Sequence, residues 1–196
     1  MKHVLYALLT AVSILFTSCG PSSNTNNPQV PNVPQPQPQP QPEVTQKVVI
    51  GYLALDDWEF ENLFPTIEWR YLTHINASFA RVKADGTLNI EPVRKRIESV
   101  RETAHKHNVK ILISLAKNSP GEFTTAINDP KARKELIQQI IAFTKEYKLD
   151  GFDIDYEEYD NWDKNFPSLL VFARGLYLAK EKNMLMTCAV NSRWLN

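Results

Sequence analysis

The stretch that decides the fold is Leu149-Asp150-Gly151-Phe152-Asp153-Ile154-Asp155-Tyr156-Glu157, in which acidic and bulky apolar residues alternate. Asp153, Asp155 and Glu157 stand at every second position of this stretch. Successive side chains of a β-strand point to opposite faces of the sheet. We therefore predict a strand over 149–157 whose three carboxylates lie on one face and whose apolar side chains lie on the other.

Three carboxylates on one strand face repel one another. Neighbouring acids on such a face lie roughly 6.5 Å apart, and at an effective dielectric constant of about 20 each charged pair repels by ~2.5 kcal/mol. Because about 1.4 kcal/mol corresponds to one pKa unit, at least one of the three pKa values should rise by more than a unit. A protonated carboxyl group beside a charged one suits general acid catalysis.

Other interpretations of the acids fit the sequence less well. An exposed acidic turn, which Glu158 and later acids would extend, does not need a bulky apolar residue at every alternate position. An EF-hand calcium loop that began at Asp153 would need Gly and Glu where Glu158 and Lys164 stand. We expect no metal and no cofactor, although a magnesium or manganese site on Asp153 and Asp155 stays open as an alternative.

Apolar runs alternate with amphipathic segments after residue 46. We predict strands over 47–53, 72–82, 110–115, 149–157 and 184–190. We predict helices that start at Glu91-Pro92, Asp129-Pro130 and Pro167, and a short helix around 64–71. This alternation indicates a parallel sheet covered by helices, either an open doubly wound sheet or a (β/α) barrel. In both, the active site lies at the carboxyl ends of the strands, where the acids stand.

The first eighteen residues are typical of a signal peptide, with Lys2 and His3 before an apolar run over 4–16. This run is too short to span a bilayer. The sequence Phe-Thr-Ser-Cys at 16–19 resembles the lipobox of bacterial lipoproteins, which implies a lipid on Cys19 and an anchor in the cell envelope, at the outer membrane or cell surface. An ordinary secretory signal is the alternative. Cys188 is then the only mature thiol, so no internal disulfide is expected.

Residues 19–46 are predicted to be a linker. Residues 20–46 hold eight of the thirteen prolines, a composition that forms no core and favours an extended polyproline II chain. A proline-rich recognition motif is the alternative. The formal net charge is zero and no basic cluster is present, so nucleic acid is not an expected partner. Residues 47–196 are enough for one domain core.

The acids Asp150, Asp153, Asp155 and Glu157 form the pattern D-x-x-D-x-D-x-E, which resembles the signature of family 18 glycoside hydrolases, the chitinases and endo-β-N-acetylglucosaminidases. Segments 72–80, 111–114 and 186–190 are similar to the second, third and fifth strands of that family. The resemblance implies an α/β fold of the (β/α)8 TIM-barrel type, truncated here after about the fifth strand. Asp150, out of phase with the other acids, is expected to have a structural role at the start of the strand.

The resemblance also implies roles for the acids. Glu157 would protonate the glycosidic oxygen, Asp155 would hold the 2-acetamido group of the substrate, and Asp153 would share a proton with Asp155. Catalysis would be substrate-assisted, because the acetamido carbonyl oxygen acts as the nucleophile, and the product would keep its anomeric configuration. The anionic neighbours would favour the protonated form that Glu157 needs as an acid.

Further residues are candidates for substrate binding. Ser114 would hydrogen-bond into the acid cluster, as its family counterpart does. The rings of Tyr52, Phe79, Trp58 and Trp162 are candidate faces for stacking on sugars, with a place in the core as the alternative for each. The expected partner is a polysaccharide or glycan that contains N-acetylglucosamine.

The sequence also departs from the family pattern. Ala116 and Lys117 occupy the places where the family usually carries a glycine pair, which leaves the choice between chitin and an N-glycan core open. A complete barrel usually takes about 250 residues, and this chain ends just past its fifth predicted strand. We therefore expect the chain to be weakly active or inactive alone. A non-catalytic glycan-binding lipoprotein and a metal-dependent hydrolase are the alternatives.

Overall fold

A computed structural model of the chain describes residues 47–158 and 160–189. The chain divides into two units, residues 1–47 and residues 48–196, and the elements below belong to the second. The predicted signal peptide, the lipidated Cys19 and the linker lie outside the described residues. None of the helices that the structure describes is long and apolar enough to cross a membrane.

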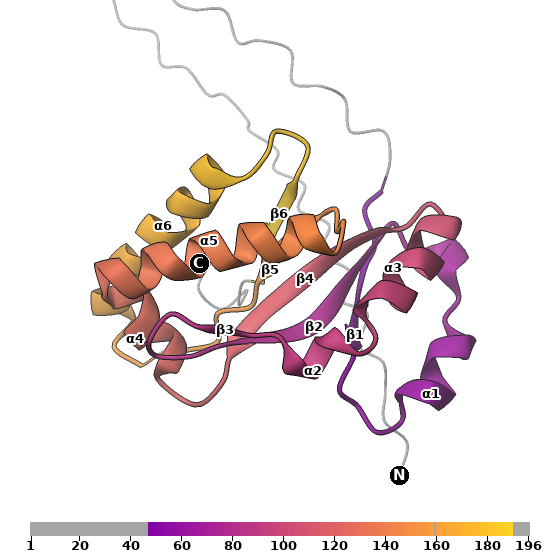
Figure 1. The fold of residues 1–196 in the computed structure, drawn as a ribbon, viewed down its shortest axis with the longest axis horizontal. Helices are drawn as coiled ribbons and strands as arrows, with labels where there is room; N and C mark the ends of the chain where they lie inside the picture. Colours follow the sequence, from indigo (N-terminus) through magenta and orange to yellow (C-terminus); the bar gives the residue numbers. More distant parts are fainter. Residues whose placement is uncertain (1–46, 159, 190–196) are drawn as a thin grey trace, which may run out of the picture. The chain divides into compact units, whose positions relative to one another are not determined.

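The described residues form one sheet whose main strands are all parallel (Figure 1). Its order is β1 (Ile50–Ala54), β2 (His74–Val82), β4 (Lys110–Lys117), β5 (Gly151–Ile154) and β6 (Leu185–Cys188). A two-residue strand, β3 (Leu88–Asn89), pairs antiparallel with the end of β2. The five predicted strands and the parallel arrangement are thus confirmed. β5 is shorter than predicted and ends at Ile154, before Asp155 and Glu157.

Helices connect successive parallel strands (Figure 1). The longer ones are α3 (Ile97–Lys106), α5 (Pro130–Glu146) and α6 (Trp162–Ala179). The short ones are α1 (Phe60–Leu63), α2 (Glu91–Arg94) and α4 (Glu122–Asn128), with 3-10 turns η1 (Phe64–Thr66) and η2 (Trp69–Tyr71). The helix predicted from Glu91 is therefore two helices, α2 and α3. Helix α4 and strand β3 were not predicted, because elements this short leave little periodic pattern in the sequence.

Two of the predicted helix starts differ in outcome. At α5 the prediction is confirmed, because Asp129 accepts a hydrogen bond from the backbone N–H of Ala132 at 2.6 Å and Pro130 is the first helical residue. At α6 the prediction is wrong, because the helix begins at Trp162 and Pro167 lies inside it. The N–H groups of Lys164 and Asn165 bond to the carbonyl of Asn161 and form a turn upstream of the proline. Pro167 lacks an N–H and crowds the carbonyl four residues earlier, but neither effect involves the bonds to the Asn161 carbonyl, so this earlier turn persists.

Both faces of the central strand are buried, as expected for a parallel sheet covered by helices. Six consecutive residues of β4, Ile111 to Ala116, are buried. On β5 and just after it, Phe152, Ile154 and Tyr156 are buried in the hydrophobic core. The predicted apolar face of the acidic stretch is thus confirmed, and its burial fixes which way the intervening acids point.

Candidate active site

Asp153 is the most enclosed of the three acids, with 1% of its surface exposed. Its carboxylate accepts hydrogen bonds from three hydroxyl groups: Tyr52 on β1 at 2.8 Å, Ser114 on β4 at 2.8 Å and Thr187 on β6 at 2.6 Å. Three donors from three strands fix the orientation of the carboxylate. The structure thus brings Tyr52 and Ser114 to the acids. Thr187 was missed, and the signal that would have found it is its register opposite Asp153 in neighbouring parallel strands.

Asp155 follows the end of β5 and is half-buried. Its backbone N–H still donates to the carbonyl of Leu115 on β4 at 3.0 Å, so the main chain continues the line of the strand. Burial is the main cause that raises the pKa of Asp155 to about 6, and the charges of Glu157 and Asp153 raise it further. The cationic side chains of Lys117 and Arg81 act in the opposite direction. Asp155 therefore exchanges a proton close to neutral pH.

Glu157 lies beyond the strand and its side chain is exposed. The ammonium group of Lys117 donates a hydrogen bond to its backbone carbonyl at 3.0 Å. An acid that must reach a substrate in solution needs this accessibility. The three acids, equally spaced in sequence, thus run from buried to exposed along the strand direction.

Glu158 does not belong to an exposed acidic turn, because only 9% of it is exposed. Its carboxylate accepts hydrogen bonds from the N–H of Gly121, from the N–H of Thr124 at 2.6 Å and from the hydroxyl of Thr124 at 2.7 Å. These donors lie at the start of α4, where a negative charge is favourable. Thr124 also bonds the hydroxyl of Tyr156 at 2.6 Å. The residues on either side of Glu157 are therefore attached to α4.

Two of the predicted sugar-binding aromatic residues lie beside the acids. Tyr52 is partly exposed, and its ring centre lies 6.4 Å from that of Phe79 on β2. Burial, followed by the charge of Asp153, raises the pKa of Tyr52, so its hydroxyl keeps the proton that it donates. The guanidinium of Arg81 lies 5.0 Å from the ring centre of Phe79. These contacts place one aromatic edge of the site on β1 and β2.

The other two aromatic candidates lie farther along the chain. Trp58 is on the loop after β1, at the carboxyl end of that strand, and 83% of it is exposed. Trp162 is the first residue of α6, and its side chain lies outside what the structure describes. The structure therefore leaves Trp58 available to a ligand.

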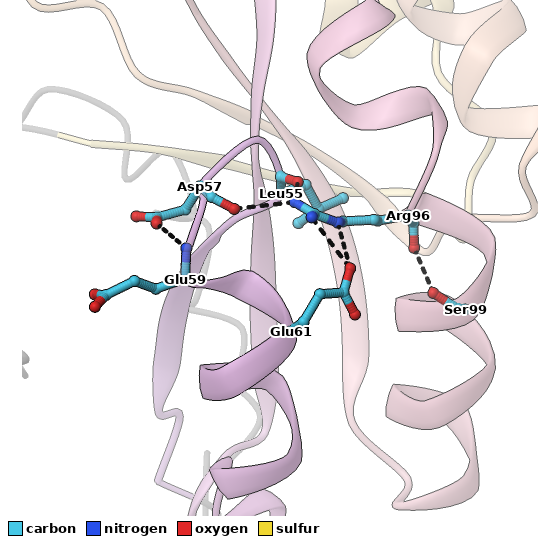
Figure 2. A network of polar contacts seen from close by, with 6 residues as sticks. All are labelled: Leu55, Asp57, Glu59, Glu61, Arg96 and Ser99. Carbon is cyan, nitrogen blue, oxygen red and sulfur yellow. Dashed lines mark hydrogen bonds and ion pairs between the residues drawn. The ribbon is translucent and has the colours of Figure 1, made fainter.

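Arg96 holds the loop that carries Trp58 (Figure 2). Its guanidinium donates to the carbonyls of Leu55 and Asp57, the latter at 3.1 Å, and bonds the carboxylate of Glu61 at 3.1 Å. The same group lies 4.3 Å from the ring centre of Phe60. Only 17% of the Arg96 side chain is exposed. Sequence reasoning missed this residue, because a lone arginine in an amphipathic segment carries no signal of such a contact.

Asp150 lies at the opposite end of β5 from Asp155. Its carboxylate accepts hydrogen bonds from the N–H of Ile111 at 2.9 Å, from Lys110 at 2.9 Å and from His105 at 2.7 Å. Burial alone would raise the pKa of Asp150, but these hydrogen bonds outweigh it and hold the pKa below its usual range. The residue ties β5 to β4 and α3, as its expected structural role requires.

The described residues contain no group of three His, Cys, Asp or Glu side chains arranged to hold a metal ion. The acid cluster lies on β5 and just past its end, at the carboxyl ends of the parallel strands, where active sites lie in folds of the TIM-barrel type.

The chain belongs to the glycosyl hydrolases family 18, whose family model matches residues 48–193. The fold class and the family resemblance read from the sequence are thus confirmed. Among solved structures, a chitinase from Bacteroides thetaiotaomicron is 98% identical, with a TM-score of 0.75 over 76% of this chain and 48% of that one. A chitinase from Rhizomucor miehei shares the fold at 22% identity, with a TM-score of 0.64 over 74% of this chain and 47% of that one.

Chitinase B from Serratia marcescens is 26% identical in an alignment 144 positions long, and that alignment covers 58% of this chain and 28% of that protein. This chain therefore spans about half the length of the solved chitinases and about a quarter of the curated one.

Proposed function

We propose that this chain hydrolyses β-1,4-linked N-acetylglucosamine in chitin or chitooligosaccharides, with retention of configuration and with the help of the substrate. The observation that carries the proposal is the graded acid cluster: an enclosed Asp153, a half-buried Asp155 with a pKa of about 6, and an exposed Glu157. The chitinases to which the chain is similar support it, and structures of the chitinase from Cycas revoluta hold N-acetylglucosamine oligomers.

In this proposal Glu157 transfers a proton to the glycosidic oxygen as the bond to C1 breaks. The carbonyl oxygen of the 2-acetamido group attacks C1 from the opposite face and closes a ring, so no ester to the enzyme forms. The Glu157 carboxylate then takes a proton from water, which opens the ring from the first face. Two inversions at C1 restore the original configuration.

Asp155 and Asp153 have separate roles in this mechanism. The Asp155 carboxyl group accepts a hydrogen bond from the N–H of the acetamido group. This bond orients the acetamido group and increases the electron density on the acetamido carbonyl oxygen. Asp153, which accepts hydrogen bonds from three hydroxyl groups, is the neighbour with which Asp155 shares a proton. Tyr52 and Phe79 form the aromatic edge against which a sugar ring packs.

The test is release of a fluorophore from a chitobioside by the purified 196-residue chain. Because the chain spans 48% of the solved chitinase, we expect slow turnover, and Glu157→Gln should lower it by about 10²- to 10⁴-fold. Asp160→Asn, at an exposed acid three residues along, is the matched control and should keep the wild-type rate. Equal rates in Glu157→Gln and wild type would refute the role of Glu157. No turnover, with chitooligosaccharides still bound in calorimetry, would support the glycan-binding alternative instead.

We also propose that residues 1–18 are removed and that a lipid on Cys19 anchors the chain in a bacterial envelope, with 19–46 as the linker. The apolar run and the Phe-Thr-Ser-Cys sequence support this. The chain should incorporate an alkyne-labelled palmitate and fractionate with membranes. Cys19→Ser should lose the label, whereas Cys188→Ser should keep it. A membrane fraction that contains unlabelled wild-type chain would contradict the proposal.

A further inference from the structure

We propose that Lys117 is a positioning residue of the active site: its ammonium group fixes the main chain at Glu157 and is one of two positive charges that act on Asp155. The inference deepens the proposed function, on which the role of Glu157 rests. The contacts of Lys117 itself do not depend on that function.

Lys117 is the last residue of β4, at the carboxyl end of the sheet. The register between β4 and β5 ends where Leu115 pairs with Ile154, so β4 continues two residues farther while the chain after β5 enters the segment 155–158. From there its ammonium group reaches the carbonyl of Glu157 at 3.0 Å. The family pattern usually carries glycine at this place, and a glycine has no side chain with which to make this bond.

Each residue of the segment 155–158 is attached by a different contact. The N–H of Asp155 bonds Leu115, the hydroxyl of Tyr156 bonds Thr124, and the carboxylate of Glu158 bonds the start of α4. The carbonyl of Glu157 accepts a hydrogen bond from the ammonium group of Lys117. A general acid must leave its own carboxyl group free for the substrate, so its position has to be fixed through its main chain. Lys117 meets that requirement.

Lys117 also belongs to the set of charged and titratable groups that face Asp155 from the surrounding elements. The anionic groups are Asp153 on β5 and Glu157, and the cationic groups are Lys117 on β4 and Arg81 on β2. Tyr52 on β1 and Cys188 on β6 are the remaining ionisable neighbours that interact with its charge. The guanidinium of Arg81 also lies 3.9 Å from the carboxylate of Asp56, whereas the ammonium group of Lys117 donates to a neutral carbonyl. Lys117 therefore provides the less neutralised of the two positive charges.

The first experiment measures the titration of the Asp155 carboxyl group by ¹³C NMR in the full chain, with the resonance assigned from Asp155→Asn. Lys117→Met keeps an unbranched side chain of similar length but removes the charge, so the midpoint should rise by about one pH unit. Lys117→Arg should restore it, because it restores the charge. Lys106→Met, at an exposed lysine on α3, is the matched control and should leave the midpoint unchanged. An unchanged midpoint in Lys117→Met would overturn the electrostatic part of the proposal.

The second experiment measures kcat and KM on the chitobioside. Lys117→Met should lower kcat by about 10- to 100-fold with little change in KM, because a displaced acid affects the transition state more than binding. A decrease that persists at low pH, where Asp155 carries its proton in both proteins, reports the positioning effect without the change in the Asp155 titration. A raised KM with an unchanged kcat would overturn the positioning role and assign Lys117 to substrate binding. If the wild-type chain shows no turnover, the proposed function fails, and the NMR titration still decides whether Lys117 faces Asp155.

Discussion

Asp153, Asp155 and Glu157 have the same spacing and side-chain chemistry, but the fold gives each a different environment. The predicted rise of at least one pKa by more than a unit is confirmed at Asp155. The predicted cause was incomplete, because burial raises the pKa of Asp155 more than repulsion between the acids does. Spacing along a strand is local and can be read from the sequence. How deeply each carboxyl group is buried depends on where the strand ends relative to the strands and helices packed against it. Those elements are distant in sequence, so the burial cannot be read from local spacing.

The raised pKa of Asp155 predicts a pH-dependent stability. Between the ordinary value of 3.8 and about 6, the folded chain binds a proton at Asp155 that the unfolded chain has released. The free energy of unfolding should therefore fall as pH rises through this range, by about 1–2 kcal/mol from Asp155 after allowance for solvent screening. Urea unfolding of wild type and Asp155→Asn at both ends of the range measures it.

The comparison of the two proteins removes the contribution of the acids that do not interact with Asp155. Asp155→Asn should lose less stability than wild type over the same pH range. If the two proteins lose the same amount, Asp155 does not hold its proton as the structure indicates.

At the scale of elements, periodic patterns predicted the strands and the start of α5. They did not predict the side-chain contacts that fix the loops between these elements. Neither the break between α2 and α3 nor the fixation of the loop after β1 is visible in the sequence. Both involve Arg96, which lies just before α3 and contacts Leu55 and Asp57 more than thirty residues earlier in the chain. The attachment of Glu158 to α4 was missed for the same reason. Such contacts depend on tertiary structure, whereas helix and strand periodicity does not.

Arg96→Lys should loosen the loop after β1. Lysine keeps the positive charge, but it lacks the planar fork that bonds two carbonyls and a carboxylate together (Figure 2). We expect a loss of about 1–3 kcal/mol in the free energy of unfolding. We also expect faster cleavage by a Glu- and Asp-specific protease within 56–59.

Arg94→Lys is the matched control, because Arg94 makes an exposed ion pair with Glu91 on the same helix, and such pairs contribute little. Mass spectrometry of the first fragments would locate the cleavage. A protease-resistant loop in Arg96→Lys would mean that the remaining contacts of 55–59 are sufficient.

At the scale of the whole molecule, the described residues form a parallel sheet with two edge strands, β1 and β6. Among these residues, each edge strand has a neighbour on one side only. Val49 and Ile50, at the β1 edge, are exposed. The sequence predicted the fold class, through the alternation of strands and helices and through the acid pattern. It could not predict the edge positions of the strands, because strand order is set by packing between distant segments.

Exposed apolar edge strands pair with other chains. We therefore expect the purified chain to self-associate as its concentration rises, and Ile50→Lys to shift the equilibrium toward the monomer. Ser99→Lys adds the same charge on α3, away from the edge, and should have little effect. Sedimentation velocity over a concentration series distinguishes them. Equal association of the two variants would place the contact elsewhere.

The three hydroxyl groups around Asp153 also have a consequence for how the chain folds. Ser114 and Thr187 are 39 and 34 residues from Asp153, but Tyr52 is 101 residues away. The entropy of loop closure grows with separation, and distant contacts slow folding. We expect β1 to dock last, so the carboxylate gains its third donor at the end of folding. Pulse-labelling hydrogen exchange should then show that the amides of β1 become protected after those of β4, and simultaneous protection would rule this order out.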